Sequence, residues 1–319
     1  MKFDKNFKIS LGTKNLKFHI RTRIKQLLVD VKNEKLSYFV DGMINSTRKW
    51  SYSRSQKLDQ SNGQTSISDY SEYSDFCGVA SKSDSIFRKF RSCSEYQVIL
   101  EHMSREQGKS YLNEIVKDNL FENQVIRQLS SDEIGKPIKF RYKGIGRVSP
   151  TQLRYTKVMS DLLKAFGDLS DFRIVEVGIG YGGQASQITN MYKIANYTLV
   201  DLPTVLNLAT KYLKLRSPHG PFSLGGESGS NNSLFDLFIS NYAFSELKRE
   251  IQDSYFENFV KNAKRGYVIY NPITPTEWGS MTATEFASKI PGAEIFEEIP
   301  NTGAGNVLVL WGHKREGSN

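Results

Sequence analysis

The stretch of sequence that decides the fold reads Val175-Glu176-Val177-Gly178-Ile179-Gly180-Tyr181-Gly182-Gly183. An apolar run at 173–177 leads into the glycines, and a helix-like run follows over about 182–193. Gly178, Gly180 and Gly183 match the G-x-G-x-x-G pattern, in which the chain turns sharply from a strand into a helix and a ligand lies against the backbone. The spacing therefore predicts a strand, a glycine turn and a helix, with a ligand site at the turn.

Two acidic residues indicate which ligand this is. A second strand is predicted over 197–200 and ends at Asp201, where a carboxylate can accept hydrogen bonds from both ribose hydroxyls. Nicotinamide enzymes and methyltransferases would both use that aspartate. Glu176 completes the methyltransferase pattern E-x-G-x-G-x-G, and an acid suits a cationic sulfonium better than a pyrophosphate, which prefers bare helix N–H groups. We therefore expect S-adenosylmethionine as the cofactor.

Beyond Asp201 the chain continues to alternate between strands and helices. Helices are predicted from Pro203 to about 215 and over 251–263, and strands over 235–239, 267–270, 294–299 and 306–311. Such alternation indicates right-handed βαβ units, and the last two strands read as an antiparallel pair. The predicted fold is α/β, a Rossmann-like seven-stranded methyltransferase sheet that is mainly parallel, with the last strand antiparallel.

The first half of the chain reads as mostly helical. Helical spacing of apolar residues runs from 84 to 129 with a break at Gly108, and the serine-rich stretch 51–75 is expected to be a loop or partly disordered. Ser149-Pro150 reads as a serine N-cap with proline at the first helical position. We expect a basic region over 1–147 that recognises the substrate or forms a lid, and an S-adenosylmethionine-binding domain over 148–319.

The net charge of +9 is unevenly distributed. Residues 1–150 hold 27 Lys and Arg against 17 Asp and Glu, whereas residues 151–319 hold 16 against 17. A basic first half favours an anionic partner, such as a nucleotide-linked sugar, a nucleic acid or a membrane surface, although solvated lysines on helix faces also account for it. The N-terminus has no apolar run typical of a signal peptide or a membrane span. Two cysteines make neither a disulfide framework nor a four-ligand zinc site, so we expect a cytoplasmic location.

Three segments together carry a resemblance to a known family. Residues 176–183 (EVGIGYGG), 197–206 (YTLVDLPTVL) and 236–247 (DLFISNYAFSEL) look like the sugar O-methyltransferases of bacterial surface-polysaccharide gene clusters, and 149–155 (SPTQLRY) resembles their lead-in helix. The likeness covers about residues 130–312. It implies an S-adenosylmethionine-dependent enzyme of polysaccharide biosynthesis. The methyl group would pass to a hydroxyl of a nucleotide-sugar or surface-glycan precursor.

The pattern assigns candidate residues to three roles. A sugar hydroxyl needs a proton acceptor, and Glu246 is the candidate catalytic base because it follows the strand 235–239 at the carboxyl edge of the sheet. The candidate cofactor-binding residues are Glu176, Gly178, Gly180, Tyr181, Gly182, Asp201, Leu202, Ser240 and Asn241. The candidate substrate-binding residues are Arg154, Tyr242 and Asn271, with Arg147 a further candidate for a substrate phosphate. No spacing marks a metal site, and Glu297 and Glu298 read as solvated.

Two other functions stay open from the sequence. An RNA-binding methyltransferase would use aromatic and basic residues such as those in 48–54 (RKWSYSR), although no nucleic-acid-binding motif accompanies them. The chain could also be a cofactor-binding relative that has lost catalysis. No prolines follow the strand at 235–239, and their absence argues against an exocyclic base amine as the methyl acceptor.

Overall fold

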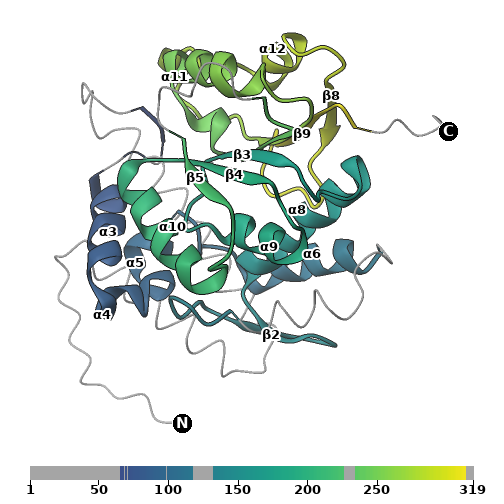
Figure 1. The fold of residues 1–319 in the computed structure, drawn as a ribbon. Coiled ribbons are helices and arrows are strands. Elements are labelled where there is room, and N and C mark those ends of the chain that lie inside the picture. The colour runs from purple at the N-terminus through teal and green to yellow at the C-terminus, as the bar shows by residue number, and fades with distance from the viewer. Residues whose placement is uncertain are drawn as a thin grey trace.

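The computed structural model describes residues 65–313 with gaps at 68, 70, 98, 118–131 and 226–233. A seven-stranded sheet forms its centre and helices cover both faces (Figure 1). In spatial order the strands are β5 (Phe222–Leu224), β4 (Asn196–Val200), β3 (Arg173–Val177), β6 (Leu237–Asn241), β7 (Gly266–Tyr270), β9 (Val307–Trp311) and β8 (Glu294–Glu297). Strands β5 to β7 are parallel, and β9 runs antiparallel to both β7 and β8. The predicted methyltransferase-type sheet with a reversed last strand is confirmed.

Successive strand residues divide between two cores. Ile174 packs on one face with helices α8 (Pro150–Phe166), α9 (Gly183–Met191) and α10 (Pro203–Arg216). Val175 packs on the other face with the π-helical turn Phe256–Val260 and helix α12 (Ala283–Ser288), near α11 (Arg249–Tyr255). Strands covered on both faces need apolar residues at successive positions, and that is how β3, β6 and β7 read. The carboxyl ends of the parallel strands are thereby left at one edge, where ligands of such sheets bind.

Helix α8 begins as predicted. The Ser149 side chain accepts a hydrogen bond from the Thr151 N–H, and Pro150 occupies the first turn. The buried Glu101 carboxylate accepts hydrogen bonds from the hydroxyls of Ser149 (3.2 Å) and Thr151 (2.9 Å). These contacts fix the start of α8 against the segment that precedes helix α6 (Arg105–Lys117).

The upstream segment packs directly on the sheet's helical layer. Helix α3 (Ser71–Lys82) lies along α10, with Ser74 and Thr204 hydroxyls 2.8 Å apart. The short helices α4 (Asp84–Phe87), η1 (Phe90–Ser92) and α5 (Ser94–Gln97) follow. Buried Arg91 donates to Asp132 (2.6 Å), which also accepts from the Tyr212 hydroxyl of α10 (3.1 Å). Hydrogen bonds and a buried ion pair therefore join the segment 71–97 to α10.

Several sequence expectations are corrected by the structure. The loop expected over 51–75 is helical from Ser71, where α3 begins. Positions 51–64 lie outside the described residues, and so does the part of the predicted helical pattern at 118–129. The expected stripe from 84 is broken into three short helices. Helix α6 continues through Gly108 without a break. The Tyr142 hydroxyl and the Pro150 ring pack so closely against this position that a side chain would not fit, which explains the glycine.

Two strand assignments also change. β6 runs to Asn241, two residues past the predicted end, while Phe235 makes only an isolated bridge to Ala263. The short edge strand β5 was not predicted, since its three residues are only partly buried and give no periodic signal. Upstream of α8, β1 (Phe140–Tyr142) pairs with β2 (Gly146–Val148) in a separate antiparallel hairpin. In the described residues no helix combines the length and apolar character needed to cross a membrane.

Candidate functional site

A cavity of about 400 Å³ lies at the carboxyl edge of the sheet. The ends of β3, β4, β6 and β7 form one wall, and the segment before α8 forms the opposite one. From the sheet side the lining includes Gly178, Gly180, Asp201, Leu202, Asn241, Tyr242, Glu246 and Asn271. From the upstream side it includes Tyr73, Leu100, His102, Met103, Gln107, Tyr111 and Arg154. Eight of the candidate residues predicted from sequence therefore face one cavity from the sheet side, and Arg154 joins them from α8.

The glycine turn shapes the cavity floor. Gly178 has φ +81°, and a Cβ there would collide with the side chain of Ala243, so only glycine fits this position. The Gly178 N–H donates to the Val200 carbonyl (2.8 Å), which pins the turn to the end of β4. Backbone from the turn, rather than side chains, consequently faces the ligand space.

Asp201 joins the turn to the second strand. Its Oδ2 accepts from the Gly180 N–H (3.0 Å) and its Oδ1 from the Leu202 N–H (2.8 Å). Burial raises the pKa of Asp201 to about 6, and the backbone hydrogen bonds oppose that shift. The carboxylate is therefore ionised at neutral pH. Each of its oxygens retains an acceptor site toward the cavity, as recognition of a ribose diol requires.

Glu176 lies behind the turn rather than in the cavity lining. Its side chain is 2% exposed and accepts a hydrogen bond from the Tyr197 hydroxyl (2.7 Å). Burial raises its pKa to about 8, although the bond from Tyr197 lowers it. Glu176 is therefore mostly protonated at neutral pH, so the charge that the sequence reading assigned to it is largely absent in this structure.

The end of β6 contains one structural and one unsatisfied polar side chain. The Ser240 hydroxyl donates to the Val177 carbonyl (3.0 Å) and accepts from the Phe244 N–H (2.9 Å), so it holds the strand ends together. Asn241 lines the cavity, and although its Oδ1 and Nδ2 are both buried, neither has a hydrogen-bond partner among the residues that the structure describes. A buried amide left without partners is costly, so Asn241 is suited to a polar ligand.

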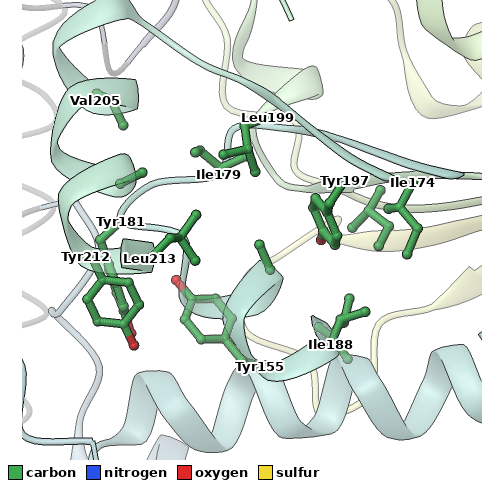
Figure 2. Close-up of a cluster of buried hydrophobic side chains, with 14 of the residues drawn as sticks. Tyr155, Ile174, Ile179, Tyr181, Ile188, Tyr197, Leu199, Val205, Tyr212 and Leu213 are labelled. Atoms are coloured by element: carbon green, nitrogen blue, oxygen red, sulfur yellow. The ribbon is translucent and has the colours of Figure 1, made fainter. Parts of the chain in front are cut away.

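Tyr181 and Gly182 lie on the far side of the turn, outside the cavity lining. Figure 2 shows Tyr181 beside Tyr212 and facing Tyr155 within the apolar core. The ring centroids are 4.8 Å from Tyr212 and 6.0 Å from Tyr155, and the Arg91 guanidinium lies 4.5 Å from the Tyr181 centroid. In this structure Tyr181 packs the upstream segment onto α9 and α10.

Glu246 and Asn271 meet at the cavity wall. Glu246 belongs to the 3₁₀ helix η2 (Phe244–Glu246), five residues beyond the end of β6. The Asn271 Nδ2 donates a hydrogen bond to the Glu246 Oε1 (2.8 Å). The Ser245 hydroxyl donates to the Asn271 Oδ1 and accepts from the Asn271 backbone N–H. Asn271 is thus fixed by Ser245 and in turn orients the carboxylate of Glu246.

Sequence reading missed several residues around the cavity. Glu298 is 5% exposed, not solvated: it accepts hydrogen bonds from the Tyr242 hydroxyl, the Thr302 N–H (2.9 Å) and Asn306 Nδ2 (3.0 Å). It follows β8 directly, so only the fold brings it to Tyr242. His102 and Tyr111 also line the cavity, but neither sits in a recognisable motif. Of the basic candidates, Arg147 is exposed on β2.

No group of three or more His, Cys, Asp or Glu side chains suited to a metal ion occurs in the described part of the chain. The polar groups present fit an adenosyl amino acid instead. Asp201 offers carboxylate acceptors, Asn241 offers a buried donor and acceptor, and Leu100 and Leu206 add apolar walls for a flat ring.

Comparisons with known proteins give distant similarities. No protein-family model matches the sequence, and no curated protein does. Among solved structures, the chain is 12% identical to the magnesium protoporphyrin IX methyltransferase of Synechocystis, which has bound S-adenosylmethionine (TM-score 0.39, 67% of this chain and 94% of that one). It is 15% identical to the mitomycin 7-O-methyltransferase (TM-score 0.36, 68% and 69%). An rRNA methylase of Streptococcus thermophilus is 13% identical (TM-score 0.37, 48% and 93%). The fold assignment rests on the strand order and the reversed strand described above.

Proposed function

We propose that this chain is an S-adenosylmethionine-dependent O-methyltransferase that acts on a sugar hydroxyl. The observation that carries the proposal is a single cavity that holds Asp201 and the unsatisfied Asn241 at the glycine turn, together with Glu246 oriented by Asn271. A carboxylate suited to a ribose and a proton acceptor in one cavity are what methyl transfer from S-adenosylmethionine to a hydroxyl requires.

The cofactor would be held by the ends of β3, β4 and β6. Asp201 would accept the ribose hydroxyls, and Asn241 would hydrogen-bond the amino-acid moiety. When bound, S-adenosylmethionine supplies a methyl group that an oxygen nucleophile displaces from a positively charged sulfur. The residues described here bind and orient the two reactants, since the donor is already activated.

Glu246 would take the proton of the acceptor hydroxyl. That proton would pass to the Glu246 carboxylate as the hydroxyl oxygen accepts the methyl group. A carboxylate has about four acceptor sites, so Glu246 can receive a hydroxyl while Asn271 holds it. Asn271 is accordingly a positioning residue, and Glu246 is the proposed catalytic base.

A sugar fits the acceptor side because that side is rich in hydrogen-bonding groups. Glu246, Asn271, Thr302 and Asn306 all line the cavity there. The resemblance to sugar O-methyltransferases, carried by residues 149–155, 176–183, 197–206 and 236–247, supports the same acceptor class.

The cofactor assignment is tested by binding. S-adenosylhomocysteine should bind the full-length protein and raise its melting temperature, while NAD and NADP should have little effect. Tight dinucleotide binding with no response to S-adenosylhomocysteine would overturn the assignment.

The acceptor assignment is tested by transfer of a labelled methyl group. Nucleotide sugars and bacterial glycan precursors should be labelled, and structured RNA should not. Labelling of RNA alone, with salt-steep binding, would replace the sugar by a nucleic acid.

A further inference from the structure

Arg154 is a buried cation that makes no ion pair with any carboxylate of the described residues. It lies on the second turn of α8, is 7% exposed and lines the cavity. Its Nε has no hydrogen-bond partner in the part of the chain that the structure describes. The titratable groups that act most strongly on it are the phenols of Tyr155, Tyr111 and Tyr242, not acids. A buried charge is costly unless an opposite charge or hydrogen bonds compensate it, so this guanidinium is suited to an external anion.

The rings of Tyr155 and Tyr242 flank the guanidinium, and its buried Nε–H is left without a hydrogen-bond partner in the described residues. Its Cζ lies 5.5 Å from the Tyr155 centroid and 5.7 Å from the Tyr242 centroid, distances typical of cation–π contacts. Tyr111 of α6 is buried and lines the same part of the cavity. Cation–π contacts engage the face of a guanidinium, whereas its N–H groups lie in the plane and bind a carboxylate or phosphate bidentately.

The position of Arg154 relates it to the acceptor rather than to the ribose. Tyr242 directly follows β6, and its hydroxyl is held by Glu298, which follows β8. Asp201 follows β4, on the opposite side of β3 from β6. Arg154 therefore contacts the half of the cavity that also holds Glu246 and Asn271.

We propose that Arg154 binds an anionic group, a carboxylate or a phosphate, of the molecule that receives the methyl group. This inference rests on the proposed function and narrows its substrate to an acidic or phosphorylated sugar, a nucleotide-linked sugar included. Asp201 and Glu246 add negative charge elsewhere in the cavity lining, so an acceptor anion is favoured at Arg154, with its hydroxyl directed toward Glu246.

The experiment measures the affinities of two ligands for four full-length proteins. Calorimetry gives the affinity of S-adenosylhomocysteine first, and then that of inorganic phosphate added to the S-adenosylhomocysteine complex at constant ionic strength. The proteins are the wild type, Arg154→Gln, Arg154→Lys and the matched control Arg141→Gln, whose arginine is exposed on β1. We expect phosphate to bind the wild type and the control. Its affinity should fall about tenfold or more in Arg154→Gln, while S-adenosylhomocysteine affinity is unchanged.

The lysine variant keeps the inference testable if Arg154→Gln fails to fold. It retains the charge but loses the bidentate fork, so phosphate should bind more weakly than to the wild type. Equal phosphate affinity in all folded variants, or no phosphate binding by the wild type, would overturn the inference.

A further ligand separates the cofactor from the acceptor as the source of the anion. Methylthioadenosine lacks the methionine carboxylate. If Arg154→Gln weakens S-adenosylhomocysteine but not methylthioadenosine, Arg154 binds the cofactor's carboxylate and the acceptor inference is wrong. If the wild type binds neither adenosyl compound, the proposed function itself fails, whatever phosphate does.

Discussion

The two halves of the cavity are built in different ways. The half proposed to hold the cofactor, the cofactor half, comes from strand ends that a short motif encodes: Gly178 and Gly180 follow β3, and Asp201 follows β4. The half proposed to hold the methyl acceptor, the acceptor half, gathers Tyr111, Arg154 and Tyr242 from three distant parts of the chain. The first half is held by backbone hydrogen bonds and the second by side-chain contacts. Changes at the acceptor half should therefore alter turnover, and changes at the cofactor half should alter binding.

The largest expected effect is a loss of turnover when Glu246, in the acceptor half, is changed. Glu246→Gln keeps the size of the side chain but cannot accept the proton, so turnover should fall by about 10²–10⁴-fold with S-adenosylhomocysteine affinity nearly unchanged. Steady-state methyl transfer and calorimetry measure the two quantities. Glu250→Gln, an exposed change in the first turn of α11, is the matched control. Near-normal turnover in Glu246→Gln would assign the base elsewhere, with His102 the next residue to test.

The next largest effect is a loss of S-adenosylhomocysteine affinity when Asp201, in the cofactor half, is changed. Asp201→Ala should weaken S-adenosylhomocysteine binding by roughly 1.5–3 kcal/mol, because hydrogen bonds from the ribose to a charged carboxylate are lost. The same variant should retain the relative rates of different acceptors. In the wild type, affinity should also fall below about pH 6 as Asp201 becomes protonated. A pH-independent affinity between pH 5 and 8 would contradict the ribose role.

Glu176 should affect the pH dependence of folding. Its pKa of about 8 lies above that of an unfolded glutamate, so the native state keeps a proton that the unfolded chain has lost. Its contribution to stability is therefore present at about pH 4.5 and falls as the pH rises toward 8. Glu176→Gln does not titrate and should gain stability relative to the wild type over this interval, by a few degrees in melting temperature at about pH 8. A constant difference from pH 5 to 8 would mean that Glu176 is ionised in the fold.

The smallest effect is expected at Tyr181. Its hydroxyl is buried and has no hydrogen-bond partner in the described ranges of the chain, so Tyr181→Phe should leave stability unchanged or slightly raised. S-adenosylhomocysteine affinity should not change either, because the ring lies in the core with Tyr155 and Tyr212 (Figure 2). Thermal unfolding and calorimetry on the variant provide the check. A clear loss of affinity would place Tyr181 in the cofactor half after all.

Local patterns were enough to predict six of the seven strands of the sheet, because the signal for each of these strands lies within a single segment. The boundaries of β3 and the start of α8 follow from an apolar run and from Ser149-Pro150, features set by neighbouring residues. Short elements such as β5 and the helices after α3 were missed or merged, since three or four residues give no periodic pattern. Gly108 was misread because its tolerance inside α6 depends on Tyr142 and Pro150, which lie 34 and 42 positions further along the chain.

By itself, the sequence determined six strands of the sheet, the glycine turn and Asp201, because each depends on residues that are adjacent or one strand apart. The tertiary structure decided which side chains meet: Glu298 with Tyr242, Tyr181 with the core, and Arg154 with the cavity. Burial and partnership are properties of the packed chain, and they set the protonation of Glu176 and the unpaired state of the Arg154 Nε. No local pattern carries that information, since the contacts join residues that only folding brings together.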